Sequence, residues 1–250
     1  MRNVSIEKLA SQAGPCSILD LSLPAKLRML ALGPHPDDFD AIGVTLRFLF
    51  HAGHSIDVAV SRTGSGVEDA YHAGLTLTGK AALREEEQRR SLEFFGLPEK
   101  RLTFLSLAND AEDQPLDNPA NLAAIENLLK SRKPDIVFLP HGNDTNSGHR
   151  VMYSLFTRAV GCLDQTVVGW LNRDPKTVAM RTDLYMPFDQ DAADWKAELL
   201  RFHDSQQQRN LRTRGHGFDE RILAVNRSIA RELKLQHDYA EAYEIETYNT

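Results

Sequence analysis

One short segment concentrates the side chains most able to do chemistry. His35, Asp37 and Asp38 lie within four residues and directly follow the apolar run 27–32. Three ionisable groups buried together would repel one another and lose their hydration. A bound divalent cation is the simplest compensation, so the segment is a candidate metal site.

A second histidine-containing segment has the same placement. Four polar loops each follow a predicted strand, at residues 34–38, 62–67, 108–113 and 140–150. In an open parallel sheet, ligands bind beyond the carboxyl ends of the strands, so these loops should converge. The first and fourth loops would then bring together His35, His141 and His149 with several acidic side chains.

This set of side chains is suited to a hydrolytic zinc site. Imidazole nitrogens and carboxylate oxygens bind zinc, and three protein ligands leave one position for water. His35, one of the two aspartates and a distant histidine would hold the ion. Zinc would lower the pKa of its bound water to about 7, and the other aspartate would accept the proton. The alternative is a plain turn in which an aspartate caps the following helix.

The elements that must position these loops alternate along the chain. Hydrophobic spacing predicts strands at 27–32, 55–61, 103–107 and 135–139, and helices at 45–52, 81–95 and 119–132. Strands separated by such helices form right-handed βαβ units with a mainly parallel sheet. Beyond about residue 165 the pattern loosens, with strand-like stretches at 167–171 and 177–187 and helices near 189–204 and 219–233.

We therefore predict a single α/β domain over residues 1–250, because no linker divides the chain. Its core, at about 27–165, is a Rossmann-like, mainly parallel sheet flanked by helices. An irregular C-terminal extension, at about 166–250, completes the rim of the active site.

The composition is that of an ordinary globular protein. The chain has 250 residues, of which 42% are hydrophobic and 26% charged, and a net charge of −6. It has no basic tract typical of a nucleic-acid arm, no apolar run near the ~20 residues of a membrane span, and no signal-peptide core. Cys16 and Cys162 form neither a disulfide framework nor a zinc motif. We predict a cytoplasmic protein without nucleic-acid or membrane partners, and leave a homo-oligomer open.

Two motifs together resemble a known family. Residues 34–38 read Pro-His-Pro-Asp-Asp, and residues 141–150 read His-Gly-Asn-Asp-Thr-Asn-Ser-Gly-His-Arg after a Pro-Asp-Ile-Val-Phe strand. The pair looks like the PIG-L/LmbE-like family of zinc-dependent N-deacetylases. Weaker matches are Arg-Glu-Glu-Glu at 84–87 with Phe-Gly-Leu at 95–97, His-Asp-Ser-Gln at 203–206 and Tyr-Ala-Glu-Ala-Tyr at 239–243. The resemblance covers about residues 27–245.

The resemblance implies a Rossmann-like α/β fold and removal of N-acetyl groups from N-acetylglucosamine-like sugars or conjugates. By position it implies that His35, Asp38 and His149 hold Zn2+, with Fe2+ as the alternative metal. It also implies that Asp37 is the general base, which accepts a proton from the attacking water while the metal polarises the amide carbonyl.

The chain departs from the family pattern in two places. The family usually has a glutamate just after the Asp-Asp pair, whereas here Phe39 and Asp40 follow, so Asp40 is the candidate replacement. Many members also have a histidine that assists the oxyanion where this chain has Asn146, which can donate a hydrogen bond but cannot carry a proton. His141 and His203 are the candidates to supply that proton.

Four residues are candidate substrate contacts through the resemblance, namely Arg84, Asn109, Asp110 and His203. Arg84 resembles an arginine that binds sugar hydroxyls, and the alternative is an exposed arginine paired within its own helix. Asn109 or Asp110 sits where the family has a substrate-binding acid, and the alternative is a turn residue. His203 would line the pocket or have a structural place.

Two other classes of function stay open from the sequence. A non-catalytic module for sugar phosphates or nucleotides would use the backbone amides of residues 62–66, Arg-Thr-Gly-Ser-Gly. A phosphoesterase would use two metals ~3.5–4 Å apart and more acidic ligands than the one clean set seen here. Metal content after purification without chelator separates the hydrolase from the binding module.

Overall fold

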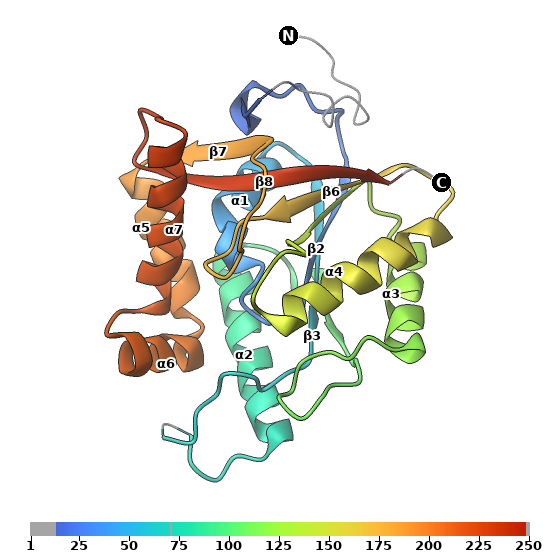
Figure 1. Ribbon diagram of the computed structural model, residues 1–250, viewed down its shortest axis with the longest axis vertical. Helices are drawn as coiled ribbons and strands as arrows, with labels where there is room; N and C mark the ends of the chain where they lie inside the picture. Colours follow the sequence, from blue (N-terminus) through green and yellow to red (C-terminus); the bar gives the residue numbers. More distant parts are fainter. Residues whose placement is uncertain (1–13, 71, 249–250) are drawn as a thin grey trace.

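A mixed eight-stranded sheet organises the protein, in the strand order β1-β7-β8-β6-β5-β2-β3-β4 (Figure 1). The structure is a computed structural model that describes residues 14–70 and 72–248. Its strands are β1 (Cys16–Ser17), β2 (Arg28–Gly33), β3 (Ser55–Ser61), β4 (Leu102–Leu105), β5 (Ile136–Pro140), β6 (Val167–Asn172), β7 (Leu184–Phe188) and β8 (Tyr239–Tyr248). The helices are α1 (Gly43–His51), α2 (Leu77–Phe95), α3 (Pro119–Arg132), α4 (Ser147–Ala159), α5 (Gln190–Arg201), α6 (Asp204–Arg214) and α7 (Phe218–Glu232).

Parallel pairing dominates the sheet and confirms the predicted α/β class. The strands β4, β3, β2, β5 and β6 are parallel neighbours, and among the strands of the described ranges only β8 runs antiparallel, against both β6 and β7. The carboxyl ends of β2 and β5 therefore lie side by side. The loops that leave these two ends are the two histidine-containing segments.

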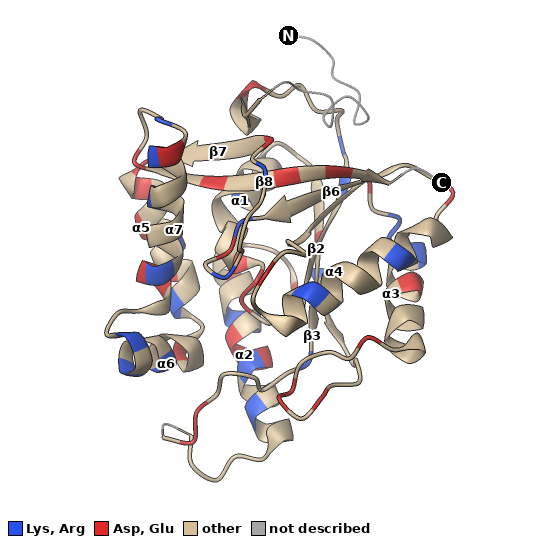
Figure 2. Ribbon diagram, viewed as in Figure 1, with Lys and Arg blue, Asp and Glu red and all other residues tan. Residues whose placement is uncertain are grey.

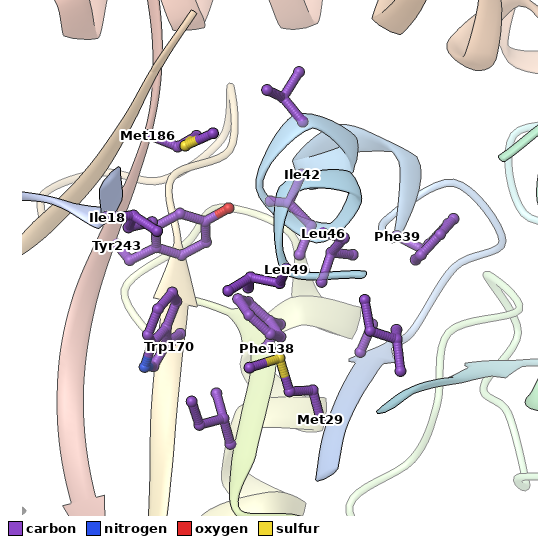
Figure 3. Close-up of a cluster of buried hydrophobic side chains, with 14 of the residues drawn as sticks. Ile18, Met29, Phe39, Ile42, Leu46, Leu49, Phe138, Trp170, Met186 and Tyr243 are labelled. Carbon is purple, nitrogen blue, oxygen red and sulfur yellow. The ribbon is translucent and has the colours of Figure 1, made fainter. Parts of the chain in front are cut away.

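Residues of the central strands alternate between two apolar layers, as the two faces of a strand require. In β2, Met29 and Ala31 belong to one core cluster, whereas Leu30 and Leu32 belong to the other. The first cluster includes residues of α1, α2 and α5, and the second includes residues of α3 and α4. Figure 3 shows part of the first cluster, where Phe138 of β5 lies beneath α1 and beside Trp170.

The C-terminal part is more regular than the sequence pattern indicated. It adds β7 and β8 to the main sheet, and α5, α6 and α7 stand together beside α2 (Figure 1). The expected strand at 177–187 is present only from Leu184, and the helix expected at 189–204 ends at Arg201. The strand β8 and the helices α4 and α6 were not predicted. Helix α6 is strongly polar, so it has no apolar stripe that could indicate a helix.

Two helix starts are set by polar side chains near the loops. Asn146 caps α4, because its Oδ1 accepts a 2.9 Å hydrogen bond from the backbone N–H of Gly148. The carboxylate of Glu241, which lies on β8, accepts hydrogen bonds from the backbone N–H groups of Val44 and Thr45 and so holds the first turn of α1. Within the described ranges, no helix is both long and apolar enough to cross a membrane.

Candidate metal centre

The loop after β2 and the first turn of α4, which follows β5, bring two histidines and one aspartate together. His35, Asp38 and His149 each offer a ligand atom, and these atoms lie within 4.8 Å of one another. The loop turns back sharply after Gly33, where an added Cβ would lie only 2.7 Å from the Asp38 side chain. Glycine at this position therefore allows Asp38 to approach the end of its own strand.

The separations of the donor atoms are those of ligands that share one ion. Asp38 Oδ1 lies 3.4 Å from His149 Nε2, and Asp38 Oδ2 lies 3.5 Å from His35 Nδ1. Two ligands at about 2.0–2.1 Å from a tetrahedral zinc ion are separated by about 3.4 Å. Both separations are compatible with one small tetrahedral cation held by the three side chains.

Neighbouring side chains orient both imidazoles toward Asp38. His35 Nε2 lies 2.9 Å from the Oε1 acceptor of Gln114, and His149 Nδ1 lies 3.1 Å from Asp144 Oδ2. Each acceptor favours a proton on the nitrogen it faces, so in the neutral imidazoles the lone pairs are on His35 Nδ1 and His149 Nε2. These are the two nitrogens that face Asp38. Partners of this kind raise the affinity of a metal site because they set the ligand tautomer.

The electrostatics show what the cluster does without a cation. Burial disfavours a charged His149, but hydrogen bonds to Asp144 and Asp38 outweigh it and raise the pKa of His149 to about 10. Burial likewise opposes ionisation of Asp38, yet His35 and His149 hold the pKa of Asp38 well below its usual range. A proton on His149 therefore neutralises the carboxylates when no metal does, and metal binding must displace that proton.

Asp37 is held by a buried arginine. Arg84, only 1% exposed, donates from Nη2 to Asp37 Oδ1 at 2.6 Å and to the carbonyl oxygen of Pro36 at 3.0 Å. Its Nη1 donates to the carbonyl oxygen of Ser65 at 2.7 Å. Arg84 thus ties α2 to both the first and the second loop and sets the direction of the Asp37 carboxylate.

A cavity of about 880 Å³ opens onto this cluster. Six of the residues singled out from the sequence line it: His35, Asp37, Asp38, Arg84, Asn146 and His149. The cavity is large enough for a sugar-sized ligand.

Four other candidates from the sequence lie outside the lining of this cavity. His141 Nε2 faces Glu244 at 3.4 Å, on the β8 side of its loop. Asn109 donates to the carbonyl oxygen of Arg62, and Asp110 accepts from backbone N–H groups of its own turn, as the turn alternative describes. His203 is fully buried.

His203 belongs to a buried polar cluster behind the metal centre. Its Nε2 hydrogen-bonds Oδ2 of Asp40, and the same oxygen accepts from Gln88 Nε2 and Ser91 Oγ. Asp40 thus joins the loop after β2 to α2 and α6. The residue expected to replace the family glutamate has a structural position here.

Sequence reasoning missed several residues of the site. Gln114 and Asp144 orient the imidazoles of His35 and His149. Asp174 Oδ1 lies 4.0 Å from His149 Nδ1, and Asp144, His149 and Asp174 form a second group of possible metal ligands. Asp174 follows β6, so the rule that located the other loops could have found it. The cavity wall also contains Lys176 and three arginines of the C-terminal helices, for which no sequence signal was visible.

Comparison with known proteins gives one family match and many structural neighbours. The family model described as PIG-L, GlcNAc-PI de-N-acetylase, matches residues 30–160. A comparison with curated protein sequences found no match.

Three solved structures illustrate the structural likeness. An N,N'-diacetylchitobiose deacetylase from Pyrococcus horikoshii has a TM-score of 0.72 at 17% identity, over 87% of this chain and 83% of that one. GalB, the 4-carboxy-2-hydroxymuconate hydratase of Pseudomonas putida, has a TM-score of 0.66 at 16% identity, over 88% of this chain and 96% of that one. A zinc-inhibited form of the teicoplanin deacetylase Orf2 has a TM-score of 0.64 at 16% identity, over 88% of this chain and 98% of that one. At these identities the likeness shows a shared fold.

Proposed function

This chain belongs to the PIG-L family, and from that premise we propose that it is a metal-dependent hydrolase that removes an N-acetyl group from an N-acetylglucosamine-like sugar or conjugate. The observation that carries the proposal is the cluster of His35, Asp38 and His149 on the cavity wall, with one nitrogen of each imidazole facing the Asp38 carboxylate. The deacetylases among the structural neighbours support the same reaction class.

The donor set favours zinc, with Fe2+ as the alternative. Two imidazoles and one carboxylate are typical of catalytic zinc, which keeps its fourth position for water or substrate. When bound, the ion would supply a Lewis acid for the amide carbonyl and lower the pKa of the attacking water. Because a related deacetylase is known in a zinc-inhibited form, the working metal has to be found by reconstitution.

Asp37 is the group we assign to proton transfer. It lines the cavity next to Asp38, and Arg84 holds its carboxylate in one orientation. Asp37 would accept the proton of the attacking water and return it to the nitrogen of the leaving amine, which needs a proton to depart. Products are a free amine and acetate.

Asn146 is the group we assign to the developing oxyanion. Its Oδ1 caps α4, which leaves the side-chain N–H groups as the donors that it can present to the cavity. A fixed donor of this kind stabilises negative charge on the carbonyl oxygen. We assign no step to His141 or His203, because both lie outside the cavity lining.

The test is a screen of N-acetylated sugars with detection of released primary amine, in metal-free protein and after addition of Zn2+ or Fe2+. We expect amine release only with metal, in a protein that binds one equivalent of it. A protein that binds no zinc, iron or manganese while its fold is intact would contradict the hydrolase and favour the metal-free binding module.

A second candidate is addition of water to a carbon–carbon double bond of a carboxylated substrate. The hydratase among the structural neighbours and the cationic part of the cavity wall support it. The two reactions are distinguished directly, because hydration removes the ultraviolet absorbance of a conjugated acid and releases no amine.

A further inference from the structure

The helices α6 and α7 contribute a cationic wall to the cavity. Arg209 and Arg214 of α6 and Arg221 of α7 line it, and Figure 2 shows the basic segments gathered on α6. Arg209 reaches across to the second loop, where its Nη1 lies 2.7 Å from the place of a Cβ at Gly66. We call these three residues the arginine wall.

The arginine wall differs from the neighbouring arginines in its partners. Arg201 pairs with Asp219 and Arg212 pairs with Glu68, each at 2.7 Å or less. Among the described residues, no carboxylate lies within 4.0 Å of the guanidinium nitrogens of the arginine wall. Three cations therefore share one wall in a protein whose net charge is −6.

The charges of the arginine wall are close enough to act on one another. Burial and then the charge of Arg214 lower the pKa of Arg221, and Arg209 lowers it further. Asp174 and Asp37, which line the same cavity, act on the pKa of Arg221 in the opposite sense. Repulsion of this kind is relieved by an anion that enters the cavity.

We propose that the arginine wall is an anion subsite, and that the substrate carries an oxyanion group, a phosphate or a carboxylate, beside its N-acyl amine. The identity of the bond cleaved rests on the proposed function, whereas the anion subsite rests on the arginines alone. Guanidinium groups suit this task because their planar donors match the oxygens of both anions. An anion held there would orient the acylated nitrogen toward the metal centre.

The first test measures binding without catalysis. Inorganic phosphate and malonate are titrated by calorimetry into the full chain after removal of metal, so that neither anion can bind a metal ion. The variants are Arg214→Gln and Arg221→Gln, and the matched control is Arg231→Gln, an exposed arginine of α7 outside the cavity. Thermal melting verifies that each variant is folded.

We expect at least one anion to bind the wild type and the control equally, about tenfold more weakly in either variant, and more weakly as salt rises. Stronger binding of phosphate indicates a phosphorylated substrate, and stronger binding of malonate a carboxylated one. Equal affinities in all four proteins, or no binding of either anion to the wild type, would overturn the anion subsite.

The second test separates this inference from the proposed function. The ratio of kcat/KM for N-acetylglucosamine 6-phosphate or N-acetylmuramate to that for neutral N-acetylglucosamine should fall about tenfold in Arg214→Gln and stay unchanged in Arg231→Gln. Anion binding that depends on Arg214, without turnover of any acylated compound, refutes the deacetylase and retains the subsite. If acylated sugars are turned over, and Arg214→Gln and Arg231→Gln have the same kcat/KM ratio of anionic to neutral substrate, the subsite is refuted and the deacetylase is retained.

Discussion

Arg84 donates a 2.6 Å hydrogen bond to Asp37, the carboxylate that immediately precedes the proposed metal ligand Asp38. The arginine is 1% exposed and its other hydrogen bonds go to backbone carbonyl groups of two loops. Two adjacent aspartates therefore have separate partners: Asp38 faces the histidines and Asp37 faces a fixed cation. This division is compatible with the roles that we propose, Asp38 as a metal ligand and Asp37 as the base.

Asp37→Asn should abolish most turnover while the metal stays bound. The amide cannot accept the proton of water, and general base catalysis contributes about 10²–10⁴-fold to rate. Asparagine keeps an oxygen that can accept from Arg84, so the fold should persist. Steady-state kinetics check the loss of turnover, and metal analysis of the same sample checks that the metal stays bound. Near-wild-type turnover would show that another group is the base.

Arg84→Lys should lower kcat by about tenfold or more with little change in KM. A lysine retains the charge but cannot donate to Asp37, Pro36 and Ser65 together, so the Asp37 carboxylate loses its fixed orientation. The matched control is Arg90→Lys, since Arg90 lies on the same helix and pairs with Glu86 at the surface. If Arg84→Lys raises KM instead and leaves kcat unchanged, the arginine binds substrate directly, as the family resemblance suggested.

His149→Ala should lose the metal, and Asp144→Ala should weaken it. Asp144 is not a proposed ligand, but it sets the tautomer of His149 through the 3.1 Å contact to Nδ1. Loss of such a partner costs about 10–100-fold in metal affinity. Competition with a chromophoric chelator measures both variants, and unchanged affinity in Asp144→Ala would mean that His149 is oriented by other contacts.

The convergence of the two loops was predictable because it follows from the parallel direction of the strands. Buried runs separated by helices predict parallel strands of one sheet, and parallel strands end at the same edge. That β2 and β5 are neighbours was not predicted. That reasoning placed His35 and His149 near each other without knowledge of any contact.

The sequence pattern could not predict the direction in which individual side chains point. His141 and His149 share a loop, yet only His149 faces the cavity, because α4 begins between them and turns its first residues inward. Arg84 lies on a helix with charged residues on every side, so periodicity could not indicate that it is buried. The pairing of Asp40 with His203, 163 residues apart, depends on the packing of α6, so no local sequence pattern could predict it.

Asp40→Asn and His203→Gln should each destabilise the fold by about 3–5 kcal/mol, because each leaves the other side chain buried without its charged partner. The destabilisation of the double variant should be smaller than the sum of the two single destabilisations, since no charged side chain then remains buried without its partner. Urea unfolding of the four proteins gives the coupling energy. Additive effects would show that the two side chains do not depend on each other.

The same pair predicts how stability depends on pH. Burial alone would lower the pKa of His203, but the Asp40 carboxylate outweighs it and raises the pKa above the ordinary value. A histidine whose pKa is raised in the folded state binds its proton more tightly there than in the unfolded chain. Its contribution is therefore complete below the unfolded pKa of about 6.5, and it is lost as pH rises through the folded pKa.

Above about pH 6.5, the free energy of unfolding of the wild type should thus fall relative to that of the double variant Asp40→Asn/His203→Gln, by up to about 1.4 kcal/mol per pH unit. The double variant is the reference because the pKa of Asp40 itself depends on His203. His149 also has a raised pKa, but it is present in both proteins and cancels in the difference. Urea unfolding of both metal-free proteins at each pH checks the prediction. A difference that stays constant as pH rises would show that the pair binds no extra proton in the folded protein, because a pair without an extra proton contributes no pH dependence.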